Sequence, residues 1–484
     1  MQKISVKTIY LILVISIGLV GLGVGSTFAM FTASSKIDNP ISFTAGIFGE
    51  SDVIETVEVT VPAGETKATN LHVTNSTNSN LNYVMWYIDE GLDIELGSKR
   101  TDSGTYQTTI GAGEEHQYEV SIRNNSNSDV TVVIGVSSGT GSVTLSSDMK
   151  MVPQSELKPT LASVITNLYI SSTKTPVTNN SITYQYDTKN NLMQDTAGNI
   201  RYYGASPNNY VYFNCDSYPS TNCELWRIIG VFDGKIKLMR NSTIGSYSWD
   251  TSASSVNSGN GVNEWSQADL MKLLNPGHES ESVGGSLYYN SKAGTCYNGS
   301  NNATTSCDFT STGIKATTKN MIAETTWNLG GWNSANIFSN EMYEKERGTT
   351  TVSNPSDGIT RATTWTGKIA LAYPSDYGYA TDLSKCSQTL YNYDSSTDSY
   401  ACRSNDWMYS IFKTNGFNWL LTPVSGYASY AFRVSSAGYV NYINDYVYAV
   451  FRANGVAPVL YLSSDQDIVS GDGSQSNPYQ LANS

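Results

Sequence analysis

The chain has 484 residues, enough for two or three domains, and carries 42 acidic against 29 basic residues, a formal net charge of −13 at pH 7. This negative balance argues against nucleic-acid binding, which requires a basic face, so no nucleic acid is expected as a partner. Only 15% of the residues are charged, whereas tyrosine occurs 33 times against 12 phenylalanines. Such a polar, weakly charged chain with regularly spaced apolar runs is typical of an exported β-rich protein and argues against disorder.

Residues 1–30 are a candidate export signal. Lys3 and Lys7 precede an apolar run over residues 9–24, and residues 27–29 offer a cleavage site flanked by small side chains. The run is long enough for either a cleaved signal peptide or a single N-terminal transmembrane helix. Because the positive charge precedes the run, everything after it is placed outside the cytoplasm. We therefore expect an extracellular or cell-surface protein, with the membrane as a partner if the helix is retained.

Two short motifs follow this apolar run. Residues 26–35 have the sequence S-T-F-A-M-F-T-A-S-S, and Phe43, Thr44, Ala45 and Gly46 form an F-T-A-G motif. This start resembles that of exported proteins in the camelysin/TasA group, although the Asp-rich segment that usually follows the cleavage site is absent. The resemblance implies export through a special signal peptide. It also implies an alternative function, that of a structural component of an extracellular matrix or surface fibre.

Residues 50–150 are predicted to form an immunoglobulin-like β-sandwich. Apolar and polar residues alternate strictly over residues 56–61, 83–88 and 117–122, and residues 129–136 give a further strand. Clusters of turn-forming residues separate these segments. Short strands at regular spacing with turn signals between them are typical of such a sandwich.

A helix and a linker are predicted over residues 151–181. Apolar residues recur at helical spacing between Ser155, the candidate N-cap, and Ile170, and the stretch up to residue 181 is rich in Ser, Thr and Asn. The main domain, residues 182–465, mixes strand patterns, short helix patterns and long polar loops, and residues 466–484 are predicted to be a polar tail. The fold class expected for the whole chain is therefore β-rich α+β.

The six cysteines all lie in the main domain and form three local couples, each flanking a polar loop: Cys215 and Cys223, Cys296 and Cys307, Cys386 and Cys402. Sequence alone leaves many connectivities open. In an exported chain, the closeness of each couple favours three local disulfides. The competing interpretation is a metal site, but there is no C-x-x-C and only His278 lies nearby. We therefore expect neither a metal nor any other cofactor.

No motif in the chain predicts an enzyme. Its three histidines are spread over the sequence without a Ser/His/Asp or Cys/His grouping. There is also no glycine-rich phosphate loop and no H-E-x-x-H. We expect no catalytic residues, and a secreted enzyme is the least favoured of the functional hypotheses.

The segment over residues 419–462 is the candidate recognition surface. Residues 430–434, 438–442 and 446–452 are short alternating runs, typical of an antiparallel meander. Tyr, Ser, Gly and Asn make adaptable binding surfaces, because Tyr gives a large contact area with few rotatable bonds. A tyrosine-rich sheet without a ligand would show the same pattern. The candidate ligand-binding residues are Tyr427, Ser429, Tyr430, Tyr439, Asn441, Tyr442, Asn444, Tyr446 and Tyr448.

Apolar residues bracket and interrupt this segment. We expect burial of the framework residues Trp419, Phe432, Val434, Val459 and Leu460. The expected exposure of Tyr430 as a binding residue conflicts with the expected burial of Phe432, because the two side chains would share a face in a regular strand.

Several motifs of the main domain carry a second resemblance. They are residues 212–215 (Y-F-N-C), 223–230 (C-E-L-W-R-I-I-G), 343–349 (Y-E-K-E-R-G-T), 373–380 (Y-P-S-D-Y-G-Y-A), 419–423 (W-L-L-T-P), 455–458 (G-V-A-P) and 471–473 (G-D-G). The domain resembles those of bacterial surface proteins of unknown function, and its end is similar to C-type-lectin-like domains related to formylglycine-generating enzymes. The G-V-R-P usual at that end is G-V-A-P here, and the final meander has no cysteine to match the catalytic cysteines of those enzymes. The resemblance implies a C-type-lectin-like fold with disulfide-closed loops that binds a surface glycan or protein, without catalysis.

Overall fold

The structure, a computed structural model, describes residues 41–45, 52–88, 91–102, 107–155, 157–348, 357–393, 399–414, 416–441, 450–463 and 466–482. The candidate export signal and the candidate site residues Tyr442, Asn444, Tyr446 and Tyr448 lie outside these residues. The chain is 14% helical and 39% strand, which confirms the β-rich α+β class. Among the described residues, no helix has the length and apolar character that crossing a membrane requires.

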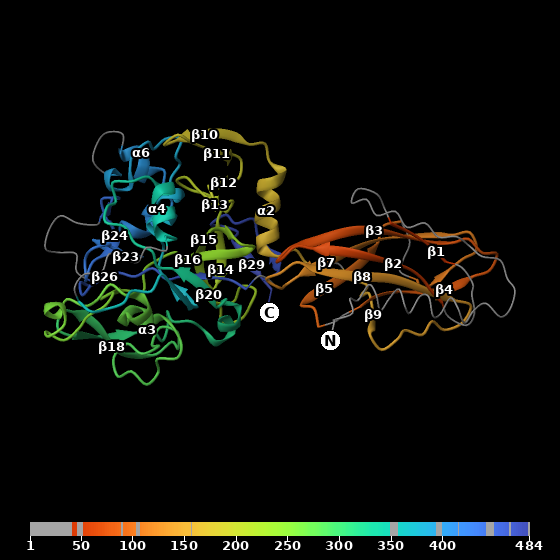
Figure 1. Cartoon of the computed structure of the whole chain (residues 1–484), viewed down its shortest axis with the longest axis horizontal. Helices are drawn as coiled ribbons and strands as arrows, with labels where there is room; N and C mark the ends of the chain where they lie inside the picture. Colours follow the sequence, from red (N-terminus) through yellow and green to blue (C-terminus); the bar gives the residue numbers. More distant parts are fainter. Residues whose placement is uncertain are drawn as a thin grey trace. The chain divides into compact units, whose positions relative to one another are not determined.

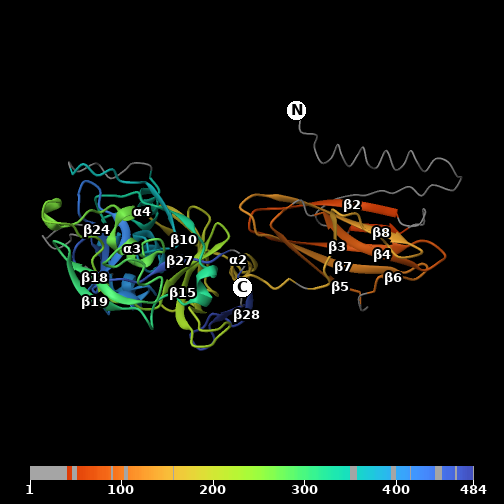
Figure 2. The same cartoon turned by 90° about the horizontal axis from the view of Figure 1, so that it is seen from below.

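The chain divides into two compact units, and the boundary along the chain falls after Leu157. Figures 1 and 2 colour the first unit red to orange and the second unit yellow to blue. The second unit begins earlier than the sequence predicted, because α2 (Leu161–Ser171) and β10 (Thr175–Asn179) belong to it. The predicted linker up to residue 181 is therefore wrong, since β10 pairs with β11 (Ile182–Asp187) at the start of the main sheet.

The predicted helix before that strand is present but shorter than expected. Thr160 is its N-cap, and the Thr160 hydroxyl accepts a hydrogen bond from the Ser163 amide at 3.1 Å. The prediction of Ser155 as the cap is therefore wrong. Pro159 precedes the cap, and a residue followed by proline is disfavoured in the helical conformation, so the helix starts only beyond it.

The first unit is a sandwich of two β-sheets. One sheet has the order β1 (Ile41–Ala45), β3 (Thr66–Asn75), β7 (Glu115–Asn124) and β5 (Ile94–Arg100). The other has the order β2 (Asp52–Val61), β8 (Val130–Gly139), β4 (Leu81–Ile88) and β6 (Thr109–Ile110), with β9 (Met149–Met151) also paired to β4. The strands predicted from alternation coincide with β2, β4, β7 and β8.

The two sheets share one apolar core, because each strand turns every second side chain inward. Tyr118 of β7 and Ile134 of β8 are both fully buried in it. Trp86 of β4 is buried beside this core, and its indole lies over Gly135 of β8, where an added Cβ would be 2.3 Å from the ring. Glycine at that position therefore makes room for the largest side chain of the unit.

The main sheet of the second unit has eleven strands and is visible in Figure 1 beside α2. Its order is β10, β11, β12 (Leu192–Gln194), β13 (Ile200–Tyr202), β15 (Glu224–Phe232), β14 (Tyr210–Phe213), β29 (Tyr479–Leu481) and β28 (Ile468–Ser470). From β15 the sheet branches to β16 (Lys235–Arg240), β27 (Val459–Tyr461) and β22 (Ile369–Ala370). The predicted polar tail is therefore wrong, since β28 and β29 lie within it and β29 pairs in parallel with β14.

A second sheet contains the predicted meander. Its order is β17 (Ser246–Tyr247), β26 (Asn454–Gly455), β23 (Phe417–Pro423), β24 (Ala431–Ser435) and β25 (Val440–Asn441). β24 and β25 are the two antiparallel strands that alternation predicted at residues 430–434 and 438–442, and β23 pairs with β24. The third predicted run, residues 446–452, lies mostly outside the described residues, and its described part, residues 450–452, forms no strand. The shorter elements around the two sheets are β18 (Ala293–Gly299), β19 (Ala303–Asp308), β20 (Thr325–Asn328), β21 (Thr364–Gly367), α3 (Asp269–Leu274), α4 (Ser339–Glu346), α5 (Pro374–Ala380), α6 (Ser399–Ser404) and α7 (Tyr409–Phe412).

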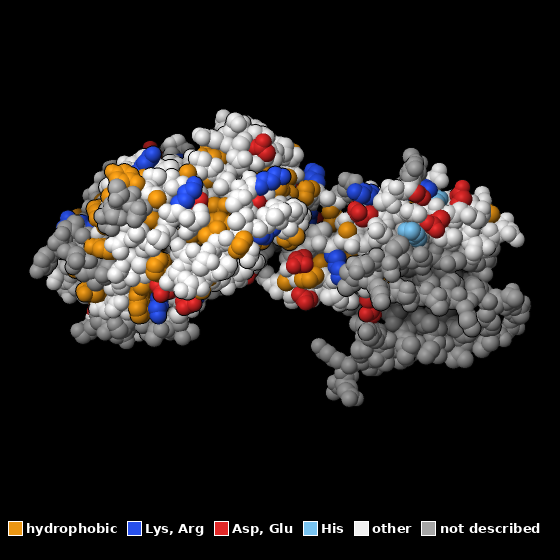
Figure 3. All heavy atoms as spheres, turned by 90° about the horizontal axis from the view of Figure 1, so that it is seen from above, with side chains coloured by type: hydrophobic (Ala, Val, Ile, Leu, Met, Phe, Trp, Pro, Cys, Tyr) orange, Lys and Arg blue, Asp and Glu red, His pale blue; other side chains and the backbone are white. Residues whose placement is uncertain are grey.

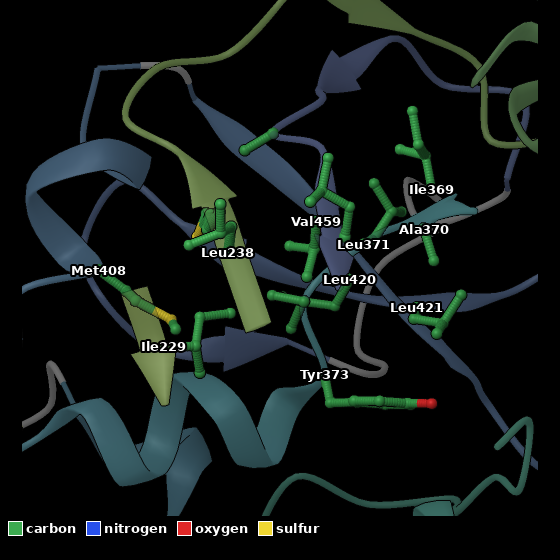
Figure 4. Close-up of a cluster of buried hydrophobic side chains, with 14 of the residues drawn as sticks. Ile229, Leu238, Ile369, Ala370, Leu371, Tyr373, Met408, Leu420, Leu421 and Val459 are labelled. Carbon is green, nitrogen blue, oxygen red and sulfur yellow. The ribbon is translucent and has the colours of Figure 1, made fainter. Parts of the chain in front are cut away.

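The core of the second unit lies where β16, β22, β23 and β27 meet. Figure 4 shows side chains of these strands converging there, among them Leu238, Ile369, Leu420 and Val459. The framework residues expected to be buried are at most 1% exposed: Trp419, Phe432, Val434, Val459 and Leu460. The burial of Val459 and Leu460 follows from the central position of β27 between β16 and β22, and Trp419 of β23 and Phe432 and Val434 of β24 belong to the same core.

All three predicted disulfides are present, and no described cysteine is free. Cys215–Cys223 closes the loop between β14 and β15, and Cys296–Cys307 links β18 to β19. Cys386–Cys402 joins the segment after α5 to α6. Closing such short loops stabilises a fold by about 2–3 kcal/mol each, mainly by restricting the unfolded chain.

Candidate functional site

The loop over residues 424–430, between β23 and β24, carries two of the predicted tyrosines. The rings of Tyr427 and Tyr430 are stacked, with centroids 5.0 Å apart and an interplanar angle of 21°. Tyr427 is 39% exposed, whereas Tyr430 is half-buried and packs against the core of the unit. The core therefore supports Tyr430, and Tyr430 in turn supports the exposed ring of Tyr427.

The expected conflict between Tyr430 and Phe432 does not arise. β24 begins at Ala431, so Tyr430 belongs to the loop and its direction is not set by the alternation of the strand. Phe432 is fully buried in β24. The two side chains can therefore have different environments.

A buried asparagine holds this loop from beneath. Asn263 is 1% exposed, and its side-chain amide donates to the carbonyls of Val424 at 3.3 Å, Tyr427 at 2.8 Å and Tyr430 at 2.8 Å. The carbonyl groups at both ends and in the middle of the loop are thus tied to one side chain. Hydrogen bonds away from water are lost at a high free-energy cost, so the loop has little freedom to rearrange.

Arg361 adds a second anchor. Its Nε donates to the Asn263 side-chain oxygen at 2.8 Å, and its Nη2 donates to the Ala428 carbonyl at 3.0 Å. Arg361 also forms an ion pair with Asp357 at 2.7 Å, and the Arg361 guanidinium lowers the pKa of that carboxyl. At the edge of the loop, the Val450 amide donates to the Ser429 carbonyl at 2.7 Å. Backbone and buried side chains together fix the positions from which the tyrosine pair extends.

Tyr439 and Asn441 lie away from the stacked pair. The Ser435 amide donates to the Tyr439 carbonyl, which places Tyr439 at the end of β24 opposite Tyr430. The half-buried Tyr439 ring makes an edge contact with Tyr391, with centroids 6.1 Å apart. Asn441 is only 5% exposed in β25, so its side chain is not presented to a ligand. Of the described candidates, the structure brings together Tyr427, Ser429 and Tyr430.

Sequence inspection missed Asn263 and Arg361, which hold the loop through hydrogen bonds to its backbone carbonyls. Both are far from the loop along the chain, and neither belongs to a recognisable motif. Only one signal could have suggested them, namely a polar residue that is expected to be buried and has no hydrogen-bond partner close to it in the sequence. Within the residues described, no group of three or more His, Cys, Asp or Glu side chains is placed to hold a metal ion.

Comparison of the chain with known protein families, with curated proteins and with solved structures found no match. The geometry of the loop is therefore the basis for the function proposed below.

Proposed function

We propose that this is an exported cell-surface protein whose second unit recognises a glycan or protein ligand, with the loop over residues 424–430 as part of the contact surface. The observation that carries the proposal is the exposed ring of Tyr427, stacked on Tyr430 and anchored through buried Asn263 and Arg361. An aromatic side chain that is already fixed loses little conformational freedom when it binds. The loop therefore has the properties of a preorganised contact.

The anchoring distinguishes this loop from an ordinary surface turn. Single exposed apolar side chains are common on proteins and need no functional explanation. Here, however, two buried polar side chains hold the backbone that presents the aromatic pair, as expected where a binding geometry must be maintained. Figure 3 shows one face of the second unit, on which uncharged groups predominate and hydrophobic side chains, tyrosine included, lie between scattered charges. Such a surface suits uncharged or weakly charged ligands.

The finer fold assignments belong to the same proposal. The two-sheet sandwich of the first unit supports an immunoglobulin-like domain acting as a stalk. The disulfide-closed loops and short helices around the sheets of the second unit support a C-type-lectin-like domain. Three disulfides also support an oxidising, extracellular location.

The test compares two exposed tyrosines. Tyr427→Ser removes the contact ring, and Tyr400→Ser removes an equally large side chain that is 61% exposed on α6. Binding of the purified proteins to a printed glycan array and to intact cells is measured beside thermal unfolding. We expect Tyr427→Ser to weaken binding about 10-fold or more, because aromatic anchors dominate interface energies. Tyr400→Ser should retain binding.

Both substitutions should change the free energy of unfolding by no more than about 0.5 kcal/mol, as is usual for surface positions. Equal binding by Tyr427→Ser and the unchanged protein would contradict the proposal. So would a loss of binding that merely follows loss of folded protein. Assembly into fibres without binding to the array or to cells would favour a matrix component instead.

A further inference from the structure

A separate cavity of about 130 Å³ lies in the second unit at the turn between β15 and β16. Its walls include the rings of Phe232, Tyr343 and Tyr461 and the polar side chains of Thr325, Lys235 and Arg347. A water molecule occupies about 30 Å³ of the liquid, so the cavity has room for several waters or for one small organic molecule. None of these residues belongs to the tyrosine loop.

Arg347 presents hydrogen-bond donors to this cavity. It follows the last residue of α4, and its guanidinium lies 3.4 Å from the centre of the Tyr343 ring. One nitrogen, Nη1, donates to the Tyr343 carbonyl at 3.3 Å and to Glu346 at 3.2 Å. Its Nε and Nη2 donate to no residue that the structure describes, and the side chain is 22% exposed. The ring and the Nη1 contacts hold the guanidinium in place, while Nε and Nη2 have no acceptor in the part of the chain that the structure describes.

A second guanidinium lies behind the aromatic walls. Arg201 is 1% exposed, and it donates to Asp195 at 2.6 Å through Nε and to Asp376 at 2.9 Å through Nη1. Its Nη2 has no partner among the described residues. The guanidinium lies 4.6 Å from the centre of the Phe232 ring and 5.5 Å from that of Tyr343. Burying a donor without a partner is unfavourable, which favours an acceptor nearby.

The charges around the cavity favour an anion over a cation. Arg201 and Lys237 share Asp376, and Asp195 offsets the second of these positive charges. Among the described residues, Arg347 forms an ion pair only with Glu346, and burial raises the pKa of Glu346 to about 7. Near neutral pH, Arg347 is therefore only partly neutralised. At the rim, Lys235 offsets the charge of Asp233.

We propose that this cavity binds a small carboxylate, such as a short-chain organic acid. The open edge of the Arg347 guanidinium pairs with the carboxylate, because its parallel N–H donors match the two carboxylate oxygens. The rings of Phe232, Tyr343 and Tyr461 contact the short hydrocarbon part of the ligand. The site goes beyond the recognition loop and is independent of it.

The pH dependence of such binding is set by Glu346, which competes for Arg347. Glu346 also accepts from the backbone amide and hydroxyl of Ser375, and the Asp376 carboxylate and Tyr373 hydroxyl lie in the same buried cluster. As the pH falls through about 7, a proton on Glu346 removes the negative charge that pairs with Arg347. Carboxylate binding should therefore strengthen as the pH falls from 8 to 6.

Isothermal titration of the full chain with sodium propionate, at constant ionic strength, tests the site. We expect saturable binding that is tighter at pH 6 than at pH 8. Arg347→Lys keeps a positive charge beside Glu346 but loses the planar pair of donors, so binding should weaken at least 10-fold. The matched control is Arg403→Lys, because Arg403 also lies over a tyrosine ring, that of Tyr400 at 4.3 Å, and also donates to a carbonyl. It should bind propionate unchanged.

A second variant tests the cavity without touching the charges. Thr325→Leu places a larger side chain in the cavity wall and should abolish propionate binding, while thermal unfolding reports whether the protein is folded. Propionate binding that is absent, or equal in Arg347→Lys and the unchanged chain, would overturn the proposal. Inorganic phosphate or chloride that binds as tightly as propionate would overturn the carboxylate assignment. Loss of binding in Arg403→Lys would show a general charge effect rather than this site.

Discussion

In both units a buried asparagine side chain donates hydrogen bonds to the carbonyls of a loop. The two units differ in how far along the chain the asparagine lies from the loop that it holds. In the first unit, the side-chain amide of Asn124 donates to the carbonyls of Ser128, Val61 and Pro62, and Asn75 does the equivalent at the end of β3. Each asparagine also accepts, through its side-chain oxygen, an amide hydrogen from two residues ahead. The turn that begins at each asparagine is therefore encoded by neighbouring residues, because hydroxyl side chains stand two and four positions after the Asn.

In the second unit, Asn263 also donates to three carbonyls, but all three lie more than 160 residues away. A regular sandwich needs buried polar groups mainly where its own strands end. A unit with long irregular loops needs them wherever a distant loop crosses the core, because buried carbonyls must find donors. The second unit should therefore depend more strongly on buried polar contacts between distant segments than the first.

The largest expected effect is on the buried ion cluster of the second unit. Although burial alone would raise it, Lys237 and Arg201 lower the pKa of Asp376 to about 2. Asp376→Asn leaves both cations without their shared negative partner, which should reduce the free energy of unfolding by about 3–5 kcal/mol. Urea unfolding followed by tryptophan fluorescence measures this, since eight of the nine tryptophans lie in the second unit.

The matched control for that prediction is in the first unit. Lys99 pairs with Glu119 at 3.4 Å, and the two side chains are 44% and 36% exposed. Glu119→Gln should change the stability by less than about 1 kcal/mol, because exposed ion pairs contribute little. Similar losses from the two substitutions would remove the contrast between the units.

An intermediate effect is expected from the asparagines themselves. Asn263→Ala removes the donor of three buried carbonyls and should destabilise the protein by about 1–3 kcal/mol. It should also abolish the ligand binding proposed for Tyr427, since the loop loses its anchor. Asn124→Ala removes the same number of carbonyl contacts from the first unit and should leave that binding intact. Binding and urea unfolding of both variants distinguish the two roles, and loss of binding in Asn124→Ala would contradict the difference.

The last effect is a pH dependence that arises in the second unit and is smaller, per pH unit, than the loss expected for Asp376→Asn. Burial raises the pKa of Asp406 to about 8, from 3.8 in the unfolded chain. Its stabilising contribution is fully present below pH 3.8 and is lost as the pH rises through 8. Between these values the free energy of unfolding should fall by up to about 1.4 kcal/mol per pH unit. Asp406→Asn should flatten the slope measured by urea unfolding from pH 5 to 8.

Asparagine at position 406 can still accept from the Met408 amide and bond to the Thr381 hydroxyl, so the fold should survive. In the first unit, the net shift of the pKa of a half-buried carboxyl has the opposite sign. Burial raises the pKa of Asp102, but the hydrogen bonds from Arg100 and the Gln117 amide, together with the charge of Arg100, outweigh it, so the net pKa is lowered and stability is lost only in acid. An unchanged slope in Asp406→Asn would show that other groups carry the pH dependence.

Features encoded by neighbouring residues could be predicted. Strict alternation predicted β2, β4 and β7 of the first unit and the β24–β25 part of the meander, whereas β1, β3, β5, β6 and β9 were not predicted. Local cysteine couples predicted all three disulfides, because each closes a loop of at most 16 residues. The burial of Trp419 and Leu460 was also predictable, since apolar runs on both sides of a polar segment have to enter a core.

Features that depend on distant partners could not be predicted in this way. Residues 171–181 look like a linker by composition, but β10 forms there because β11 offers it an edge to pair with. The same holds for the polar tail, whose β29 completes its hydrogen bonds on β14. Polar composition describes how a segment interacts with water, and it does not record an available strand edge.

The sequence by itself determined the β-rich class, the disulfides, the framework of the meander and the tyrosines that form its candidate surface. Only the tertiary structure decided which tyrosines act together, because Tyr427 and Tyr430 stack over a loop held by Asn263 and Arg361. It also decided where charge is buried, since Arg201 and Asp376 meet across 175 residues. Local patterns fix which way a side chain points along its own strand, whereas these contacts arise only when separate segments are packed and their buried polar groups must find partners.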